Sequence, residues 1–477
     1  MELIRRLMWT LSYNPSRVFS RMVMASGASQ EVMSTPQDFS ESTVILGAGV
    51  IGLSTAYYLA LALNESLPQL SHPSKNPPIV VIDPSQEVCP GASGTATGGL
   101  GDFGFSPETT PLGFLSYSLH QDLASKFGGK EKYGFSDLGI YRVSPKDFTG
   151  TPSPSNSWGP HAPIGREISD LPPWIKPSED WKVVSLADAP NSAHLDPGKF
   201  CRFLRESCEE LGVKFLLNSV VTSLDRDEMA HRFTSATVET KEPISSTQTI
   251  PCSSVVIAAG PWSDRVFSHL FPAARCKLRM NTTRSAGNHF LARIPHWKPS
   301  DDDKGVNQVF LNDAIPGPNG LDITSFLGGT LYVGGHGAKP EILPDRADSV
   351  EAQPEEIAAM VKLTRTFLHL EADQELEIVE TGRCYRPLAV PNRPIITKVP
   401  WPLLSSENWR PVAPENVDTN CPGFFRGGLF INTGHNSDGV TLGPGSGKVM
   451  SELILGHIPS AEISELGLDS DEHTSHL

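Results

Sequence analysis

Three glycines near residue 50 have the spacing of a phosphate-binding turn. Gly47, Gly49 and Gly52 form a Gly-x-Gly-x-x-Gly pattern between the β-branched segment 44–46 and an apolar stretch that ends at residue 63. In a strand–turn–helix unit, the first glycine allows a tight turn, the second lets the backbone approach a pyrophosphate, and the third lets helix and strand pack closely. The free N–H groups and the positive dipole end of the helix then attract the phosphates. The pattern predicts that a dinucleotide binds here.

An acidic residue completes this unit. Asp83 follows the apolar segment 79–82, where its carboxylate can accept hydrogen bonds from the ribose hydroxyls of the adenosine. A carboxylate at this point repels a 2′-phosphate, which argues against an NADP-type site. Residues 44–63 are also long and apolar enough for a membrane-spanning helix, but the glycine pattern and the second strand favour the dinucleotide-binding unit.

The composition of the chain excludes several other classes of protein. Its 477 residues are enough for two or three domains, and 39% of them are hydrophobic, so a sizeable core is expected. The 39 basic and 54 acidic residues give a net charge of −15, which argues against a nucleic-acid partner. The seven cysteines form no Cys-x-x-Cys pair, so neither a disulfide framework nor a zinc site is expected. We therefore expect an acidic globular protein of a reducing compartment, without a metal site.

Five further segments follow Asp83 in an order that resembles one known family. They are 91–99, rich in small and hydroxylated residues; 194–221, with Asp-Pro and Gly-Val pairs; 255–263; 382–396; and 432–447, with Thr-Gly-His before several glycines. Together with the glycine pattern, they are similar to the motifs of the D-amino-acid oxidase superfamily of FAD-dependent oxidoreductases, which includes glycine and sarcosine oxidases. The resemblance extends from about residue 43 to residue 457 and is greatest to a fungal-type branch.

The resemblance implies an α/β fold with two parts. One is a discontinuous Rossmann-like FAD-binding domain, and the other is an α+β substrate domain built on a mixed or antiparallel sheet. We expect the FAD-binding domain to comprise 41–110, 190–275 and 375–460, and the substrate domain to comprise 111–189 and 276–374. Residues 1–40 are expected to be a disordered or targeting extension, and 461–477 a flexible acidic tail.

FAD is the cofactor that the resemblance implies, and its contacts are expected from six parts of the chain. These contacts are Gly47, Gly49, Val50, Ile51, Gly52, Asp83, Ala92, Ser93, Gly98, Gly99, Val221, Ala259, Gly260, Trp262, Gly434, Gly439, Val440 and Thr441. A helix expected to begin at 443–447 would direct its N-terminal N–H groups and its dipole at the negative charge of a reduced flavin. The alternative is that the glycines of this segment only permit a tight turn.

Four residues are candidates for contact with the substrate. Arg386 stands where an arginine of the family binds a substrate carboxylate, and Arg383 is a second candidate. Tyr385 and His435 are expected to face the substrate as well. Each has a structural alternative: an arginine paired with one of the many acids, a core tyrosine, or a histidine with satisfied hydrogen bonds.

Two positions bear on how the flavin is held and reoxidised. In the sarcosine-oxidase branch, a lysine on the strand before a Gly-x-His sequence helps to activate oxygen, and Tyr332 occupies that place here, in 331–336. Cys384 stands at the spacing from Ile395 at which that branch attaches FAD through a thioether. We expect non-covalent FAD, with covalent attachment at Cys384 as the alternative to a buried free thiol.

These expectations lead to a reaction. The chain is predicted to oxidise the C–N bond of an amine or amino acid by hydride transfer to FAD, with reoxidation by O2 to hydrogen peroxide. One alternative is a flavin dehydrogenase that uses another electron acceptor, and a second is an FAD-stabilised scaffold or trafficking factor without turnover. The expected partners are a small amine or amino acid and O2 or another acceptor, with no nucleic acid and no integral membrane segment.

The two ends of the chain point to different compartments. Residues 1–24 carry four arginines and one acid, which is the composition of a mitochondrial transit peptide or of a disordered extension. The last three residues, Ser475, His476 and Leu477, resemble the Ser-Lys-Leu peroxisomal signal. Because a peroxide-forming oxidase suits a peroxisome, we expect a peroxisomal protein, with a mitochondrial or cytoplasmic one as the alternative.

Overall fold

The computed structural model describes most of the chain from residue 42 onward. The described residues are 42–66, 79–148, 161, 163–227, 232–241, 244–281, 286–295, 297, 306–315, 320–335, 341–371, 374–405 and 427–468. The extension expected at 1–40, the Ser-His-Leu end and His336 lie outside these ranges. In the ranges given, no helix has the length and apolar character needed to cross a membrane.

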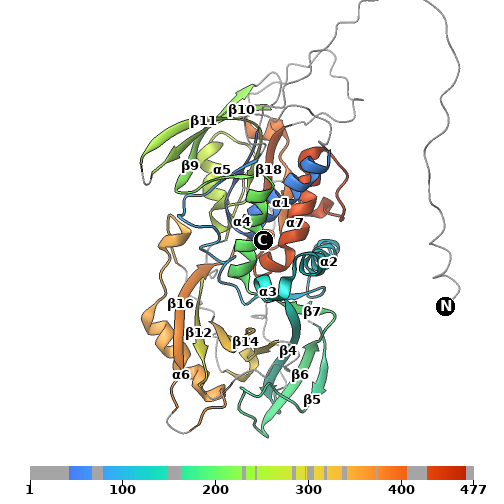
Figure 1. Cartoon of the computed structure of the whole chain (residues 1–477), viewed down its shortest axis with the longest axis vertical. Helices are drawn as coiled ribbons and strands as arrows, with labels where there is room; N and C mark the ends of the chain where they lie inside the picture. Colours follow the sequence, from blue (N-terminus) through green and yellow to red (C-terminus); the bar gives the residue numbers. More distant parts are fainter. Residues whose placement is uncertain are drawn as a thin grey trace, which may run out of the picture. The chain divides into compact units, whose positions relative to one another are not determined.

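A mainly parallel sheet carries the glycine-rich turn (Figure 1). Its strand order is β17-β18-β11-β1-β2-β8, in which β17 runs antiparallel to β18 and the other neighbours are parallel. The strands are β1 (Ser42–Leu46), β2 (Ile79–Ile82), β8 (Lys214–Leu216), β11 (Ser246–Ile257), β17 (Ile395–Lys398) and β18 (Gly428–Thr433). The first half of β11 continues into an antiparallel ribbon with β10 (Arg232–Thr240), which in turn pairs with β9 (Ser219–Asp227).

The β1–α1 unit forms as the sequence predicts. Every residue of β1 is buried, and α1 (Val50–Ser66) begins directly after Gly49. Gly47 has a φ of 117°, a conformation that favours glycine. A Cβ atom on Gly52 would lie 2.0 Å from the Gly47 carbonyl oxygen, so helix and strand can meet closely only without a side chain here. The expected Rossmann-like arrangement is confirmed.

Helices cover one face of this sheet, and the β9–β10 ribbon with α5 covers the other. The helices that share a core on the first face are α1, α2 (Thr110–Phe127), α3 (Gly129–Tyr133), α4 (Pro197–Glu210) and α7 (Gly439–Leu455). On the second face, Phe233 of the ribbon packs with Phe271 and Trp401 beside α5 (Ser263–Leu270). Alternate residues of β1 contribute to the two cores: Ile45 to the first, and Val44 and Leu46 to the second.

A second sheet, of mixed direction, forms the other part of the structure (Figure 1). Its order is β16-β12-β15-β14-β13-β4-β6-β5, and of these neighbours β13 and β4 are parallel. The strands are β4 (Ser136–Pro145), β5 (Arg166–Ile168), β6 (Trp181–Ala187), β12 (Ala286–Arg293), β13 (Val306–Phe310), β14 (Leu321–Ser325), β15 (Thr330–Gly335) and β16 (Glu377–Tyr385), with β3 (Gly99–Gly101) and β7 (Ser192–His194) joined beside β4. One face packs on α6 (Pro354–Phe367), which leaves the other face for the cavity described below. The expected mixed sheet is confirmed.

Three segments lie elsewhere than their expected domain. The helices α2 and α3, expected in the substrate domain, pack with α7 and α4 in the core of the first sheet. Strand β16, expected in the FAD-binding domain, is hydrogen-bonded along β12 in the second sheet. Leu466, expected in a flexible tail, is fully buried. An apolar helix or strand carries no marker for which of two cores it joins, so these assignments required the structure.

Candidate functional site

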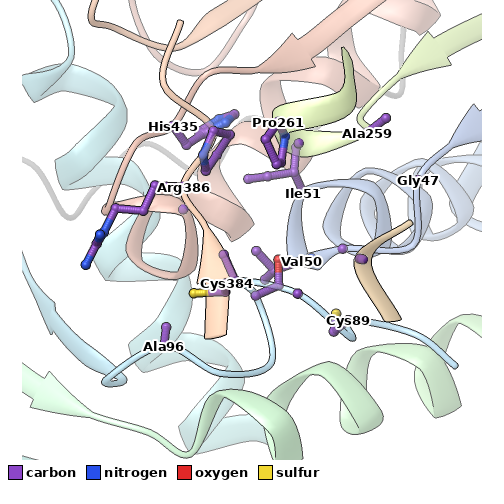
Figure 2. A pocket seen from close by; sticks show the side chains of 18 of the residues that line it. Gly47, Val50, Ile51, Cys89, Ala96, Ala259, Pro261, Cys384, Arg386 and His435 are labelled. Atoms are coloured by element: carbon purple, nitrogen blue, oxygen red, sulfur yellow. Dashed lines mark hydrogen bonds between the residues drawn. The ribbon is translucent and has the colours of Figure 1, made fainter. Parts of the chain in front are cut away.

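A cavity of about 840 Å³ lies at the carboxyl ends of the parallel strands, between them and the second sheet. Ligands of open α/β sheets bind at this edge. Figure 2 shows part of its wall, with Val50 and Ile51 at the start of α1, Ala96 in the loop between β2 and β3, and Cys384 and Arg386 at the end of β16. All but three of the expected FAD contacts line this cavity.

The three exceptions are Gly52, described above, Gly98 and Gly434. A Cβ atom on Gly98 would lie 1.9 Å from the Leu195 carbonyl oxygen, and one on Gly434 would lie 2.7 Å from the Ala389 Cβ. Their φ angles are 81° and 82°, which favour glycine. These glycines therefore shape the backbone around the cavity and do not line it.

The start of α1 has the features of an anion site. Ser93 Oγ accepts the Val50 N–H at 3.1 Å, and a Cβ atom on Gly49 would lie 3.1 Å from the same oxygen. The helix N–H groups that follow have no partner within the helix, as in any first turn. A pyrophosphate in this cradle meets those N–H groups and the positive end of the dipole, so the residues present fit a dinucleotide.

Asp83 lies beneath the turn and beside the cavity. Its Oδ2 accepts the Ala48 N–H at 2.8 Å, and its Oδ1 accepts the Ser85 N–H at 2.8 Å. Burial raises the pKa of Asp83, and the two backbone N–H groups act in the opposite direction. Because a carboxylate offers about four lone-pair sites, it retains the capacity to accept ribose hydroxyls. Val221, another of the expected FAD contacts, lines the same cavity.

A second helix N-terminus reaches the cavity. The expected start of this helix at 443–447 was wrong, because α7 begins at Gly439. Gly439, Val440 and Thr441 all line the cavity. A Cβ atom on Gly443 would lie 3.1 Å from Val50 Cγ2, and one on Gly447 would lie 2.4 Å from the carbonyl carbon of Ser54. The helix α7 thus crosses α1 at glycines, which brings both positive helix ends to one cavity.

Pro444 explains the difference in the helix start. Proline is favoured in the first turn of a helix and cannot donate to the carbonyl group four residues before it, here that of Val440. His120 of α2 supplies the missing donor, because its Nε2–H bonds to the Val440 oxygen at 2.9 Å. Ser116 of α2 donates to the Thr441 oxygen at 2.6 Å. Side chains of α2 therefore complete the first turns of α7, which the sequence of α7 alone does not indicate.

Strand β16 and the residue that follows it carry three of the four candidates for substrate contact. Successive side chains of a strand point to opposite faces. Cys384 and Arg386 line the cavity, whereas Arg383 and Tyr385 are buried on the other side of the strand. Arg386 thus lies at the site, and the expectation that Tyr385 faces the substrate is replaced by its structural alternative.

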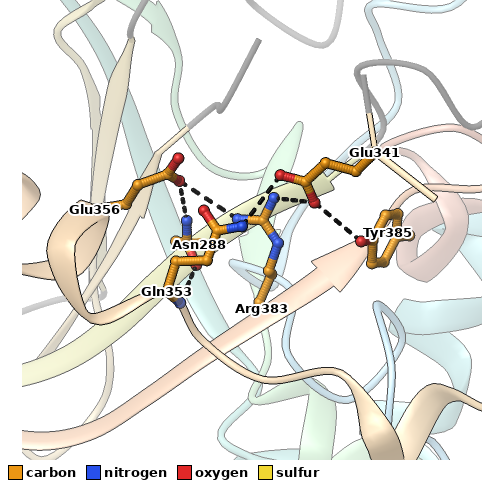
Figure 3. Close-up of polar contacts among 6 residues, drawn as sticks. All are labelled: Asn288, Glu341, Gln353, Glu356, Arg383 and Tyr385. Carbon is orange, nitrogen blue, oxygen red and sulfur yellow. Dashed lines mark hydrogen bonds and ion pairs between the residues drawn. The ribbon is translucent and has the colours of Figure 1, made fainter. Parts of the chain in front are cut away.

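The buried Arg383 lies in an ionic network with two partly exposed carboxylates (Figure 3). Its Nη2 is 2.6 Å from Glu341 Oε2 and its Nη1 is 3.4 Å from Glu356 Oε2, with 3% of the side chain exposed. Tyr385 donates its hydroxyl hydrogen to Glu341 at 3.0 Å, and the Asn288 amide donates to Glu356. Because Glu356 belongs to α6 and Asn288 to β12, the network fixes β16 and, through it, the position of Arg386.

Arg386 and His435 differ in what they offer a ligand. The Arg386 guanidinium makes no hydrogen bond or ion pair with the part of the chain that the structure describes. A guanidinium without an acceptor in a cavity is a site for a carboxylate. His435 Nε2 lies 2.8 Å from Ser446 Oγ, and burial lowers the pKa of this histidine to about 3. Its ring is therefore neutral at pH 7 and adds no charge to the cavity.

The second sheet adds residues that the sequence did not single out. Asp322 of β14 and Gln308 of β13 line the cavity, as does Asp438 before α7. Burial raises the pKa of Asp322 to about 6 and that of Asp438 to about 7. An acid or amide within a short apolar strand has no surrounding motif, so no sequence signal marked Asp322 and Gln308. Tyr332, in the place of the family's lysine, also lines the cavity.

His120 gives the protein a predicted sensitivity to acid. Burial lowers the pKa of His120 to about 4. An unfolded histidine titrates at about 6.5, so the unfolded chain gains the proton first, and stability present above that pH is lost as the pH falls toward 4. We expect wild type to lose ~2 kcal/mol more unfolding free energy between pH 7 and pH 5 than His120→Gln, whose amide still donates to Val440. Denaturant unfolding at both pH values measures this.

The matched control for this prediction is His457→Gln, at an exposed position. It should lose the same unfolding free energy on acidification as wild type. Equal losses in wild type and His120→Gln would show that burial does not lower the pKa of His120.

The Arg383 network gives a prediction for stability. Arg383→Met removes two charge-assisted contacts and leaves two partly exposed carboxylates without their cation, so we expect the unfolding free energy to fall by about 2–3 kcal/mol. Arg293→Met is the control, because Arg293 pairs with Glu377 on the same two strands, with about half of each side chain exposed. This variant should lose less than about 1 kcal/mol. Similar losses in both variants would contradict a structural role of the Arg383 network.

Comparison with known proteins identifies relatives over almost all of the described chain. Residues 42–453 match the sequence model of the DAO family, described as FAD dependent oxidoreductase. A protein of Schizosaccharomyces pombe, named only as an oxidoreductase, is 24% identical over 447 residues, which cover 90% of this chain and 97% of that protein. The fold is similar to that of glycine oxidase from Bacillus cereus, with a TM-score of 0.60, 20% identity and coverage of 90% and 99%. It is also similar to that of L-amino acid deaminase from Proteus myxofaciens, with a TM-score of 0.61, 18% identity and coverage of 94% and 96%.

Proposed function

Because the chain belongs to the DAO family of FAD-dependent oxidoreductases, we propose that it oxidises the C–N bond of an amino acid or amine, with O2 as the final acceptor and hydrogen peroxide as a product. The family expected from the sequence is confirmed, and the substrate and the acceptor are the proposal. Two proteins of similar fold are named a glycine oxidase and an L-amino acid deaminase, which supports an amino acid as the substrate.

One observation carries the proposal: Arg386 lies in the cavity without a partner among the described residues. Its guanidinium can bind a carboxylate through two parallel hydrogen bonds, which fixes both the position and the orientation of a small acid. The Arg383 network holds the strand that leads to it. An arginine fixed in this way orients a substrate for a reaction at the neighbouring carbon.

The other residues of the cavity favour the same chemistry. FAD, when bound, supplies an acceptor for the hydride that leaves the carbon next to the amine. The N–H groups of Val440 and Thr441 and the dipole of α7 stabilise negative charge at the cavity wall. The neutral ring of His435 introduces no competing charge. The chain thus contributes binding, orientation and electrostatic stabilisation.

A second candidate, a dehydrogenase that passes electrons to an acceptor other than O2, is favoured by Tyr332. This residue is 7% exposed, lines the cavity and stacks on His289 with ring centroids 5.3 Å apart. Burial raises the pKa of its hydroxyl well above the ordinary value, so the side chain remains neutral. A neutral tyrosine supplies no cation where the sarcosine-oxidase branch has one, and slow reaction with O2 follows.

Arg386 provides the test of the reaction. We expect Arg386→Met to lower kcat/KM for the best amino acid about 100-fold or more, since two charge-assisted hydrogen bonds are lost. A panel of amino acids and amines, assayed for peroxide and with an artificial electron acceptor, supplies the measurement. Arg293→Met, at the last residue of β12, where the side chain is half exposed, should retain wild-type turnover.

The same panel separates the candidates. Peroxide formed in air supports an oxidase, and turnover with the artificial acceptor alone supports a dehydrogenase. FAD-loaded wild type that turns over no member of the panel with either acceptor would favour the third alternative, a flavin-stabilised scaffold.

Tyr332 provides a prediction for the reaction with oxygen. Tyr332→Lys should increase the rate at which O2 reoxidises the flavin by about tenfold or more, because a cation stabilises the charge that develops on oxygen. Tyr332→Phe, which remains neutral, should keep the wild-type rate. Stopped-flow mixing of the reduced proteins with O2 measures both. An unchanged rate in a Tyr332→Lys protein with full FAD content would show that Tyr332 does not set the reactivity toward oxygen.

A further inference from the structure

An acid and an arginine lie above two glycines on the cavity side of the second sheet. Arg386 follows the end of β16 and Asp322 belongs to β14, with β12 and β15 between them. Both side chains line the cavity, as do Gly287 of β12 and Gly334 of β15. The two middle strands therefore have no side chains of their own at these points. The ring of Tyr332 borders the acid, since a Cβ atom on Gly334 would lie 3.1 Å from Tyr332 Cε1.

Each charged side chain reaches over one of the glycines. A Cβ atom on Gly287 would lie 3.4 Å from Arg386 Nη1, and one on Gly334 would lie 2.3 Å from Asp322 Oδ1. Gly334 pairs with His289, so Gly287 is its diagonal neighbour across the two strands. Diagonal neighbours are about 7–8 Å apart. The spacing of the two glycines thus sets the scale of the gap between the charged groups that reach over them, and among the described residues no ion pair joins those groups.

An α-amino acid has the size to bridge this separation. Two bonds of about 1.5 Å connect its amine nitrogen to its carboxyl carbon. A charge-assisted hydrogen bond of about 2.8 Å then fits at each end. The carboxylate would bind Arg386 and the ammonium group would bind Asp322. The length of the amino acid together with the two hydrogen bonds is comparable to the diagonal spacing of the strands.

Asp322 has few partners of its own. Burial raises its pKa to about 6, while the charge of Arg386 and a hydrogen bond with Gln308 act in the opposite direction. At pH 7 the carboxylate is therefore mostly ionised and still short of hydrogen-bond donors. A buried charge in this state is costly, and a cationic ligand group stabilises it.

We propose that Asp322 holds the positively charged amino group of the substrate, beside Arg386, which binds the carboxylate. This inference rests on the proposed function and deepens it by naming the residue that recognises the amino group of the substrate. A plain carboxylate meets the repulsion of Asp322, and an amine without a carboxylate leaves Arg386 without an acceptor. Asp322 is thus a specificity-determining residue that acts by rejection as well as by attraction.

Three probes of nearly the same shape test this assignment. 2-Aminoisobutyrate is a zwitterion, pivalate has a methyl group in place of its ammonium group, and tert-butylamine has a methyl group in place of its carboxylate. None of them has the hydrogen that the reaction removes, so binding is measured without turnover. Calorimetric titration of the FAD-loaded protein gives the three dissociation constants.

Wild type should bind 2-aminoisobutyrate more tightly than either analogue. Asp322→Asn should weaken the binding of 2-aminoisobutyrate about 10- to 100-fold and strengthen that of pivalate, because a repulsive charge is removed. Asp345→Asn is the matched control at the rim of the same cavity, where the Asp345 side chain is fully exposed, and it should change neither constant. A general loss of structure cannot produce the opposite signs expected for the two ligands.

Equal effects of Asp322→Asn on both ligands, or no effect, would overturn the inference. Asp322→Glu, which keeps the charge, is the second variant and should retain the preference for 2-aminoisobutyrate over pivalate. Failure of the proposed function looks different: the FAD-supplemented wild type shows no flavin absorption, or Arg386→Met binds pivalate as tightly as wild type does.

Discussion

The close crossing of α1 and α7 positions the rest of the site. Because α7 has glycines where it meets α1, the two helices approach closely and both N-termini reach one cavity. Each N-terminus carries a partial positive charge, so this wall of the cavity favours an anionic ligand. Helix α2 maintains the arrangement by supplying the hydrogen bond that Pro444 removes from α7. The two helix N-termini at the cavity therefore depend on one helix contact.

The opposite wall of the cavity carries charged side chains of the second sheet instead of helix N-termini. The second sheet presents Arg386 without a partner among the described residues and Asp322 with few partners, above strands that have glycine at the intervening positions. Isolated buried charges are costly in a folded protein unless a ligand completes them. The same strands place the Arg383 network behind the site, where a cation and two carboxylates neutralise one another and hold β16 in place. On one side of β16, Arg383 is paired with carboxylates of the protein, whereas on the other side Arg386 faces the cavity, where a ligand can bind it.

The sequence predicts the parts of the site that depend on local chemistry. Gly47, Gly49 and Asp83 lie where their motif places them, because turn geometry and close backbone approach are set by neighbouring residues. The sequence alone does not show that Tyr385 and Arg386 lie on different sides of the second sheet. The register of β16 decides this, since a shift of one residue along a strand reverses the face. The predicted start of α7 was wrong because the hydrogen-bond donor that Pro444 lacks is supplied by His120 of α2, more than 300 residues away. Asp322 becomes significant only once β14 and β16 share a sheet.

The central claim is that this cavity places an amino acid beside bound FAD. Its most direct test mixes the FAD-loaded protein with amino acids in the absence of oxygen and follows the flavin absorption band. We expect at least one zwitterionic α-amino acid to bleach the band, while the corresponding hydroxy acid and the amine without a carboxylate leave it unchanged. A band that persists with every amino acid tested, in protein with a full complement of FAD, would contradict the claim.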